Sequence, residues 1–290
     1  MGLMIALLGT AVLADEKSAD HLFIISIDGL RPDALQRAVT PNIDTLWQNG
    51  AYSWRAQTIF PSTTLPSHVS MLTGLRPEKH RVIWNFWNPR AGYVHAETVF
   101  EIARRAGLKT AMFVGKQKLQ HIAKPNTVDR FDFPGYAAET VMGRAVTYIA
   151  AERPQLVFIH LADPDGAGHS FGWMSNKQIE AIETVDRVVG QLITTLHNLD
   201  LFDRSLIIIT ADHGGHGKTH GSRNPLDMTI PWIIHGSGIR RGYRIPNDVR
   251  TYDTAATALF ALGLSVPEGW DGRPVCRAFI TPRDGAPPCR

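Results

Sequence analysis

The sequence predicts an α/β domain in which a mostly parallel central sheet has helices on both faces. Short apolar runs bounded by polar residues recur along the chain, a pattern typical of buried strands. Segments with helical periodicity separate these runs, and strands that alternate with helices favour a parallel sheet. The chain has 290 residues, 44% hydrophobic and 20% charged, which is ordinary for a globular protein and sufficient for one large domain.

Local signals place the individual elements. The apolar runs predict strands at residues 21–27, 52–58, 109–114, 156–161, 206–209 and 228–235. Helices are expected at residues 40–50, 65–74, 97–106, 136–152, 175–199 and 254–262. Thr40 and Asp253 are the expected caps of two helices, and Gly50 and Gly74 suit helix ends. We expect a single catalytic domain over residues 20–276, because no repeat or low-complexity linker divides the chain.

The two ends of the chain indicate export to the periplasm or the exterior. Residues 1–14 resemble a signal peptide, because residues 2–14 are apolar, too short to span a bilayer, and end in Val12-Leu13-Ala14. The stretch lacks Lys and Arg at its start, so a disordered apolar N-terminus is the alternative. Pairing of Cys276 with Cys289 would clip the tail, residues 277–290, to the domain and would suit an oxidising compartment; two free thiols are the alternative.

Three of the expected strands end in side chains that bind metals. The residues after strands 21–27, 156–161 and 206–209 include Asp28, Asp165, His169, Asp212, His213 and His220. Open α/β sheets bind ligands at the carboxyl ends of their strands, so these side chains are expected to converge. Imidazole nitrogen and carboxylate oxygen are ligands that zinc accepts. Any one tip could be a polar loop by chance, but together they indicate a metal site.

A hydroxyl is expected near the same edge. The helix that ends at Gly74 begins near Leu65 or Pro66, which puts Thr64 at its N-terminus. Free N–H groups and the helix dipole favour a phosphate or an alkoxide there. Thr64 could also serve simply as the N-cap, and the two roles are compatible.

These motifs together resemble the alkaline phosphatase superfamily, and most of all its type I phosphodiesterase / nucleotide pyrophosphatase branch. The resemblance covers about Phe23 to Pro274. The matching stretches are Ile27 to Arg31, Pro61 to Gly74, Asp165 to His169, Asp212-His213-Gly214 and Thr219-His220-Gly221, in family order. The resemblance implies an alkaline phosphatase-like fold with two divalent ions, zinc in most members, with manganese or a mixed pair as alternatives.

The resemblance also implies the ligand sets. Asp165, His169 and His220 would hold one ion, and Asp28, Asp212, His213 and the Thr64 oxygen would belong to the other. Thr64 would be the nucleophile and would form a phosphothreonine intermediate. Metal coordination would activate its hydroxyl, which is otherwise too weak a nucleophile.

Two further features bear on specificity. Asn85 falls where this branch places an asparagine that donates to the phosphoryl oxygen, although a plain loop amide is the alternative. Nucleotide pyrophosphatases usually carry a sizeable insertion between the Asp-His pair and the last histidine. Here only Gly214 to Thr219 intervene, so we expect a small or absent cap and an altered leaving-group pocket.

The predicted function is a two-metal hydrolase of small-molecule phosphate esters or diesters. A phosphomonoesterase, phosphonate hydrolase or sulfatase of the same superfamily is the alternative, and a secreted binding protein is the non-enzymatic one. Thr64-Leu65-Pro66-Ser67-His68 departs from the Cys/Ser-x-Pro-x-Arg motif of sulfatases, and no Gly-x-Ser-x-Gly elbow is present. A net charge of +3 without a long basic run does not indicate nucleic-acid binding, and no later stretch predicts a membrane span.

Several other residues near the motifs are expected to have supporting roles. His68 lies four residues after Thr64 on the same helix face, and we expect it to support the site. His160, Asp163 and His235 are expected to be structural or to support the metal ligands. His216 could be an extra ligand but has no matching role in this branch. The aromatic residues Trp84, Phe86 and Trp87 could stack on a leaving group or pack over the sheet edge.

Overall fold

The computed structural model describes residues 17–246 and 248–280. The expected signal peptide and Cys289 lie outside the described residues, as does the tail from residue 281 onward. Cys276 is disulfide-bonded and almost completely buried. Within the described part of the chain, no helix is both long enough and apolar enough to cross a membrane.

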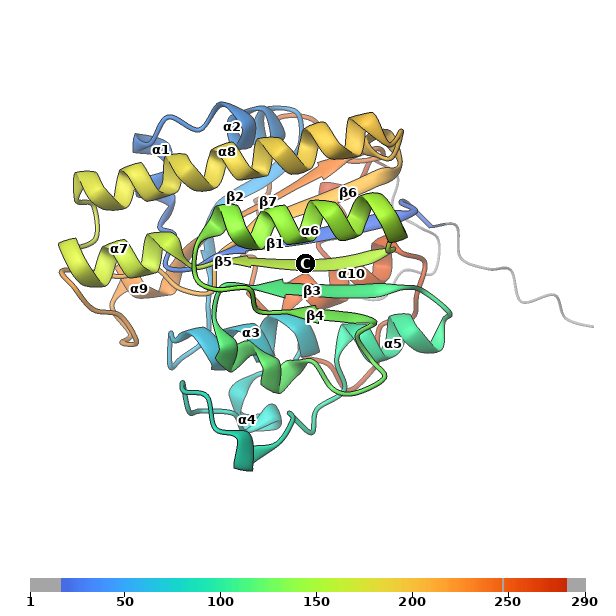
Figure 1. Cartoon of the computed structure of the whole chain (residues 1–290), viewed down its shortest axis with the longest axis horizontal. Coiled ribbons are helices and arrows are strands. Elements are labelled where there is room, and N and C mark those ends of the chain that lie inside the picture. Colours follow the sequence, from blue (N-terminus) through green and yellow to red (C-terminus); the bar gives the residue numbers. More distant parts are fainter. Residues whose placement is uncertain (1–16, 247, 281–290) are drawn as a thin grey trace, which may run out of the picture.

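An eight-stranded sheet, in the order β4-β3-β5-β1-β6-β7-β2-β8, forms the centre of the molecule (Figure 1). Its strands are β1 (His21–Ile27), β2 (Ala51–Gln57), β3 (Thr110–Val114), β4 (Arg130–Asp132), β5 (Leu156–Leu161), β6 (Ser205–Thr210), β7 (Thr229–Gly236) and β8 (Tyr243–Arg244). Among the strands described, β7 alone runs against the others, because it pairs antiparallel with both β6 and β2. The prediction of a mostly parallel sheet is confirmed.

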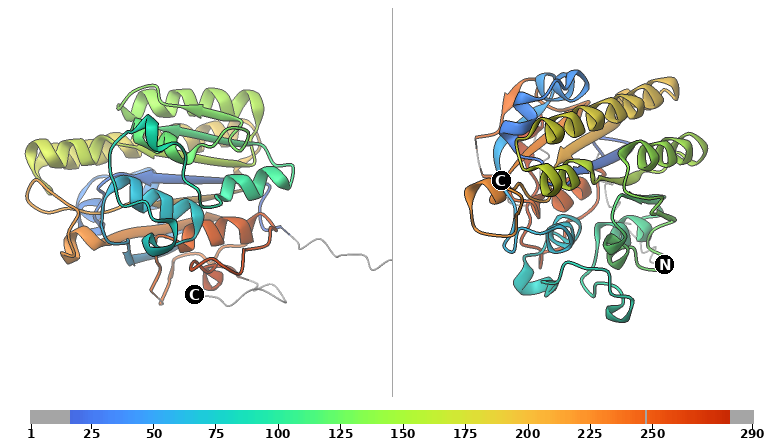
Figure 2. Two further views of the ribbon diagram at one scale, coloured as in Figure 1. Left: turned by 90° about the horizontal axis from the view of Figure 1, so that it is seen from below. Right: turned by 60° about the vertical axis from the view of Figure 1, so that its left-hand side comes forward.

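Helices cover both faces of the sheet. They are α1 (Pro32–Arg37), α2 (Pro41–Gln48), α3 (Thr64–Thr73), α4 (Pro77–His80), α5 (Val99–Arg105), α6 (Ala138–Glu152), α7 (Asp163–Phe171), α8 (Asn176–Asn198), α9 (Pro225–Met228) and α10 (Asp253–Ala261). Figure 2 shows the long helices α6 and α8 on one side of the sheet and α3 and α10 on the other. α7 and α9 lie beyond the left-hand end of the strands in Figure 1.

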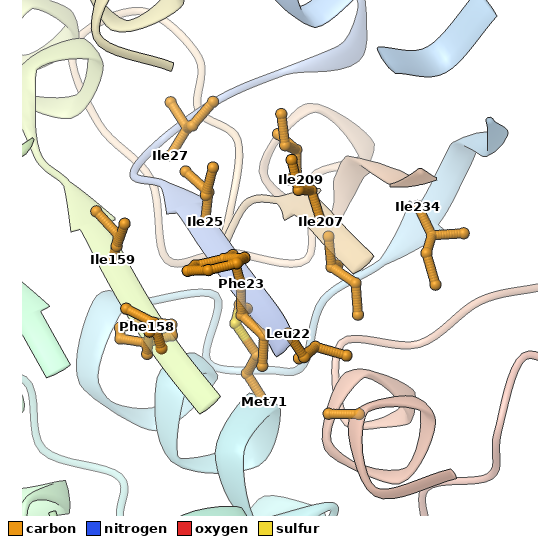
Figure 3. Packing of buried hydrophobic residues seen from close by; sticks show 14 of the residues in the cluster. Leu22, Phe23, Ile25, Ile27, Met71, Phe158, Ile159, Ile207, Ile209 and Ile234 are labelled. Carbon is orange, nitrogen blue, oxygen red and sulfur yellow. The ribbon is translucent and has the colours of Figure 1, made fainter. Parts of the chain in front are cut away.

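The core consists of the central strands and the inner faces of the helices that cover them. β1, β5 and β6 are buried along their whole length, which explains why they are continuous apolar runs without alternation. Figure 3 shows Phe23 and Ile25 of β1 between Ile159 on β5 and Ile207 on β6. Burial of one such side chain contributes about 1.5–3 kcal/mol, so these strands form a stiff base for the residues that follow them.

Most expected elements occur within one or two residues of their predicted bounds, and the differences lie at helix ends. Asp253 is the first residue of α10 instead of its cap, and its carboxylate accepts the backbone N–H groups of Arg250 and Arg273. The N-cap position of α3 belongs to Thr63, so Thr64 is its first helical residue. The strands β4 and β8 and the helices α1, α4, α7 and α9 were not predicted.

Candidate metal centre

Three adjacent parallel strands bring the predicted residues to one edge of the sheet. β1 lies between β5 and β6, with Ile27 level with Leu161 and Ser26 level with Thr210. Because the strands end at the same level, Asp28 emerges between the start of α7 on one side and Asp212 on the other. The Gly29 N–H donates to the Asp212 carboxylate at 3.2 Å, which ties these two strand ends together.

The first group of candidate ligands consists of Asp28, Asp212 and His213. All three are fully buried, and one donor atom from each lies within 4.8 Å of the others. His213 Nε2 lies 3.3 Å from Asp28 Oδ1 and 3.3 Å from Asp212 Oδ2. Two carboxylates and one imidazole therefore face a common point.

The second group consists of Asp165, His169 and His220. Asp165 and His169 lie one turn apart on α7 and so project from the same face of that helix. Asp165 Oδ1 lies 3.4 Å from His169 Nε2 and 3.6 Å from His220 Nε2. Donor atoms of the three residues lie within 4.8 Å of one another. The rings of His213 and His220 stack with centroids 3.7 Å apart, so the two groups adjoin.

Four donor atoms of the two groups of candidate ligands have no hydrogen-bond partner within the described residues. Asp28 Oδ1, Asp212 Oδ2, Asp165 Oδ1 and His213 Nε2 are buried and have no hydrogen-bond partner there. Buried polar atoms normally have partners, and four such atoms in two adjoining groups are exceptional. This arrangement fits divalent cations bound by nitrogen and oxygen.

Backbone carbonyls orient the three histidines. The Nδ1 atoms of His169, His213 and His220 lie 3.0, 2.8 and 3.0 Å from the carbonyl oxygens of Lys218, Gly214 and Ser62. A carbonyl only accepts, so Nδ1 carries the proton in each neutral ring and Nε2 has a free lone pair. This is the arrangement that metal-binding histidines require.

Burial and nearby charges shift the pKa values of these groups. Burial, then the neighbouring Asp28, raises the pKa of Asp212 well above its usual range. Burial would also raise the pKa of Asp28, but Lys116 and the hydrogen bond from His160 outweigh it and hold that pKa well below the usual range. Burial and His213 lower the pKa of His220 to about 4, so the ring stays neutral and able to ligate at physiological pH.

Thr64 lies beside both groups. Its side chain is buried at the start of α3, and its Oγ1 lies 3.4 Å from Nζ of Lys116. The same Nζ lies 2.7 Å from Asp28 Oδ2 and 2.6 Å from Asp165 Oδ2. One ammonium group therefore touches a carboxylate of each group and the Thr64 hydroxyl, which shows that all three share one site.

Asn85 reaches this site from the loop after α4. Its Oδ1 accepts the Leu65 N–H at 2.9 Å and Nζ of Lys118 at 3.2 Å. These bonds identify Oδ1 and leave the amide NH₂ of Asn85 free to donate. Lys116 and Lys118 were not among the predicted site residues, although they follow the predicted strand β3 at the same sheet edge.

The indole of Trp173 supports the second group. It packs edge-on against the rings of His169 and His220, with centroids 5.2 and 5.8 Å away, and its Nε1 donates to the Gly29 carbonyl at 2.9 Å. A Cβ on Gly168 would lie 2.8 Å from this indole, and one on Gly215 would lie 2.2 Å from it. Glycine at these two positions makes room for the ring.

The remaining residues of interest have supporting positions. His160 Nε2 lies 2.8 Å from Asp28 Oδ2, and His68 Nδ1 lies 2.7 Å from the Thr64 carbonyl oxygen. His216 Nδ1 lies 2.6 Å from the carboxylate of Asp227, away from both groups of ligands.

The outer residues lie apart from the two groups. His235 packs against Phe202, and Asp163 begins α7. The aromatic residues of the nearby loop differ in exposure. Trp87 packs on His121 and Trp84 is partly buried, whereas Phe86 is 57% exposed.

The sheet, its helices and the two groups of ligands at its carboxyl edge define an alkaline phosphatase-like fold. Residues 22–223 match the type I phosphodiesterase / nucleotide pyrophosphatase family, and the chain belongs to that family. This confirms the resemblance that the motifs indicated.

Individual relatives agree with this assignment. An uncharacterized pyrophosphatase/phosphodiesterase of Schizosaccharomyces pombe is 30% identical over 215 residues, which are 67% of this chain and 44% of that protein. Human ectonucleotide pyrophosphatase/phosphodiesterase family member 1 is 27% identical over 212 residues, 66% of this chain and 23% of the relative. The chain thus matches less than half the length of either relative.

A solved structure shows the same fold. An inactive variant of murine ectonucleotide pyrophosphatase/phosphodiesterase 5 in complex with AMP superposes with a TM-score of 0.74 at 16% identity. The superposition covers 87% of this chain and 97% of the murine one.

Proposed function

We propose that this protein is a two-metal phosphodiesterase/pyrophosphatase-type hydrolase that acts through a phosphothreonine on Thr64. The supporting observation is the contact of one ammonium group, that of Lys116, with Asp28, Asp165 and the Thr64 hydroxyl. A nucleophile thus lies at the junction of two groups of ligands. Family membership supports the same reaction class.

Asp28, Asp212, His213 and the Thr64 oxygen would hold one ion, and Asp165, His169 and His220 would hold the other. Three imidazoles and three carboxylates suit zinc best, and manganese or a mixed pair are the alternatives. When bound, two such cations polarise the phosphoryl group and favour the deprotonated hydroxyl.

The chain itself supplies the nucleophile and its orientation. Thr64 Oγ1 attacks phosphorus from the first position of α3, and the bond from phosphorus to the leaving group breaks. Water then hydrolyses the phosphothreonine and restores the hydroxyl. The backbone N–H of Thr64 has no partner within the helix, and we expect it to face the incoming anion. The bond from His68 to the Thr64 carbonyl fixes this turn. The NH₂ group of Asn85 donates to a phosphoryl oxygen, because the Leu65 N–H and Lys118 hold its other amide atom.

We propose small phosphate esters or diesters as substrates, including nucleotide derivatives, because a relative of the same fold binds AMP. We place the activity outside the cytoplasm, in keeping with the expected signal peptide and the ectonucleotide name of the human relative. The short span from His213 to His220 leaves little chain to cover the leaving group.

A hydrolysis panel tests the proposal. Purified protein reconstituted with zinc or manganese should cleave aryl phosphate esters and lose that activity with a chelator. Asp212→Ala should abolish it, and the remote change Lys177→Met should not. Equal activity of the Asp212→Ala protein would contradict the proposal.

A further inference from the structure

Two lysines lie beside Thr64 and Asn85, the residues proposed to contact the phosphoryl group. Lys116 and Lys118 follow the end of β3, which is parallel to β5 and opens at the same sheet edge. Nζ of Lys116 lies 3.4 Å from Thr64 Oγ1, and Nζ of Lys118 lies 3.2 Å from Asn85 Oδ1. The two ammonium groups therefore lie beside the proposed nucleophile and beside the proposed phosphoryl donor.

Lys118 has no counter-ion among the described residues. Its ammonium group donates to the neutral amide oxygen of Asn85, and no carboxylate of the described chain lies within ion-pair distance. Burial and the neighbouring Lys116 lower its pKa. A partly buried cation that faces a binding site without a carboxylate is costly to maintain unless an anion arrives from outside.

Within the described part of the chain, the ion pairs of Lys116 are with carboxylates that the metal ions would also need. Asp28 and Asp165 each use one oxygen for Lys116, and both are proposed metal ligands. The three carboxylates of the site cannot balance two divalent ions and two ammonium groups. The loaded site therefore has an excess of positive charge, greatest where the two lysines lie.

We propose that Lys116 and Lys118 form a specificity site for a second negative charge at, or directly next to, the scissile phosphoryl group. This rests on the proposed function, because it takes Thr64 and Asn85 as the residues that contact that group. The shared chemistry is a dianionic phosphoryl end, supplied either by a phosphomonoester or by a neighbouring phosphate in a pyrophosphate. A plain diester has one charge and leaves Lys118 unpaired.

Substrate pairs that differ in charge test this with a matched leaving group. 4-Nitrophenyl phosphate carries two charges above the second pKa of phosphate, whereas bis(4-nitrophenyl) phosphate carries one. Lys118→Met should lower kcat/KM for the monoester relative to the diester by roughly 10- to 100-fold, the usual value of a hydrogen bond to a charged group. ADP in ¹⁸O-labelled water distinguishes the two sources: attack on the β-phosphorus, a dianionic end, puts the label in phosphate, whereas attack on the α-phosphorus beside a neighbouring phosphate puts it in AMP.

The design separates charge recognition from damage to the site. Asn85 keeps its 2.9 Å bond from the Leu65 N–H in the variant, so diester turnover should fall less than monoester turnover, and the ratio of the two is the readout. Lys118→Arg should restore much of the selectivity. Lys177→Met, an exposed lysine on α8 that pairs with Glu180, is the control. Metal content of the Lys118→Met protein should equal that of the wild type.

Equilibrium binding provides a readout that needs no turnover. By calorimetry, metal-loaded wild-type protein should bind inorganic phosphate more tightly than dimethyl phosphate, and Lys118→Met should reduce that ratio by the same 10- to 100-fold. An unchanged ratio of the two affinities, or an equal loss of kcat/KM for all three substrates, would overturn the proposal. A wild type that hydrolyses no ester but keeps a Lys118-dependent preference for phosphate would instead refute the proposed function alone.

Discussion

The imidazole rings of His213 and His220 lie face to face, with centroids 3.7 Å and planes 12° apart. Each ring belongs to a different group of candidate ligands, so the two groups meet at this stack. His213 is fully buried, whereas His220 sits on the short loop that follows it. The two sites are therefore expected to be adjacent and separable.

Metal analysis should find two divalent ions per reconstituted chain. Asp212→Ala should remove the ion held with Asp28, and His169→Ala the ion held with Asp165, so each variant should retain one. The reason is that each change deletes a donor atom from one group only. Elemental analysis after dialysis measures the stoichiometry, and a wild type with at most one ion would refute the paired arrangement.

Replacement of Thr64 tests the covalent route. Thr64→Ala should reduce kcat by roughly a thousandfold or more, because it removes the nucleophile while every carboxylate and imidazole remains. Thr64→Ser should keep measurable turnover. Folding should survive, because the side chain of Thr64 does not cap α3.

The neighbour Thr63 gives a matched control. Thr63 occupies the N-cap position, yet its Oγ1 has no hydrogen-bond partner among the described residues, so Thr63→Ala deletes no bond. It should cost far less than Thr64→Ala in steady-state assays. Trapping of labelled phosphate on Thr64 would support the intermediate. Near-wild-type turnover of Thr64→Ala would indicate direct attack by water instead.

The space around the two glycines of α7 predicts which of these positions tolerates a side chain. Gly168→Ala would put a methyl group 2.8 Å from the Trp173 indole, whereas a Cβ on Gly166 meets nothing within 4 Å. We expect Gly168→Ala to displace the indole and to weaken metal binding at the Asp165 group several-fold. Gly166→Ala should leave metal binding unchanged and stabilise the helix by up to about 1 kcal/mol. Metal titration and urea unfolding of both variants measure the difference.

Acid stability should depend on a histidine outside the metal site. His80 is buried, its Nδ1 accepts the Val82 N–H at 3.1 Å, its Nε2 lies 2.9 Å from Ser70 Oγ, and burial lowers its pKa to about 4. Between that value and the ordinary pKa of about 6.5, the unfolded chain binds the extra proton more readily. The free energy of unfolding should therefore fall as the pH falls through this window.

His80→Gln should flatten that part of the pH profile. His95 is exposed, so His95→Gln is the control and should leave the profile as in the wild type. Urea unfolding of metal-free protein at several pH values between 7 and 4 measures the slope. An identical slope in wild type and His80→Gln would contradict the assignment.

The central strands and the grouping of six ligand side chains could be predicted because both depend on local pattern. A buried parallel strand is a short apolar run, and Asp28 and Asp212 follow such runs directly. Helix α7 escaped prediction because Pro164, Gly166 and Gly168 have low helix propensity. In the structure His169 of this helix packs against the Trp173 indole, which in turn donates to the Gly29 carbonyl beyond β1, a contact between segments distant in sequence.

The contacts across the site could not be read from the chain. Asn85 meets the Leu65 N–H only because the loop after α4 folds back over the start of α3. Lys116 was overlooked because a lysine at a strand end does not suggest a metal ligand. Its position between Asp28 and Asp165 depends on the order in which β3, β5 and β1 pair.

The short loop between His213 and His220 has a consequence for any attempt to change specificity. Its tip is a tight turn in which His216 and Thr219 bond to each other, and the Gly217 and Lys218 carbonyls accept from the Trp173 N–H and His169 Nδ1. The Lys218 carbonyl at this tip thus keeps the proton of neutral His169, a candidate ligand on α7, at Nδ1. A longer loop grafted here to grip a leaving group would gain contact area while releasing His169, so new selectivity is better built on the exposed Phe86 side of the site.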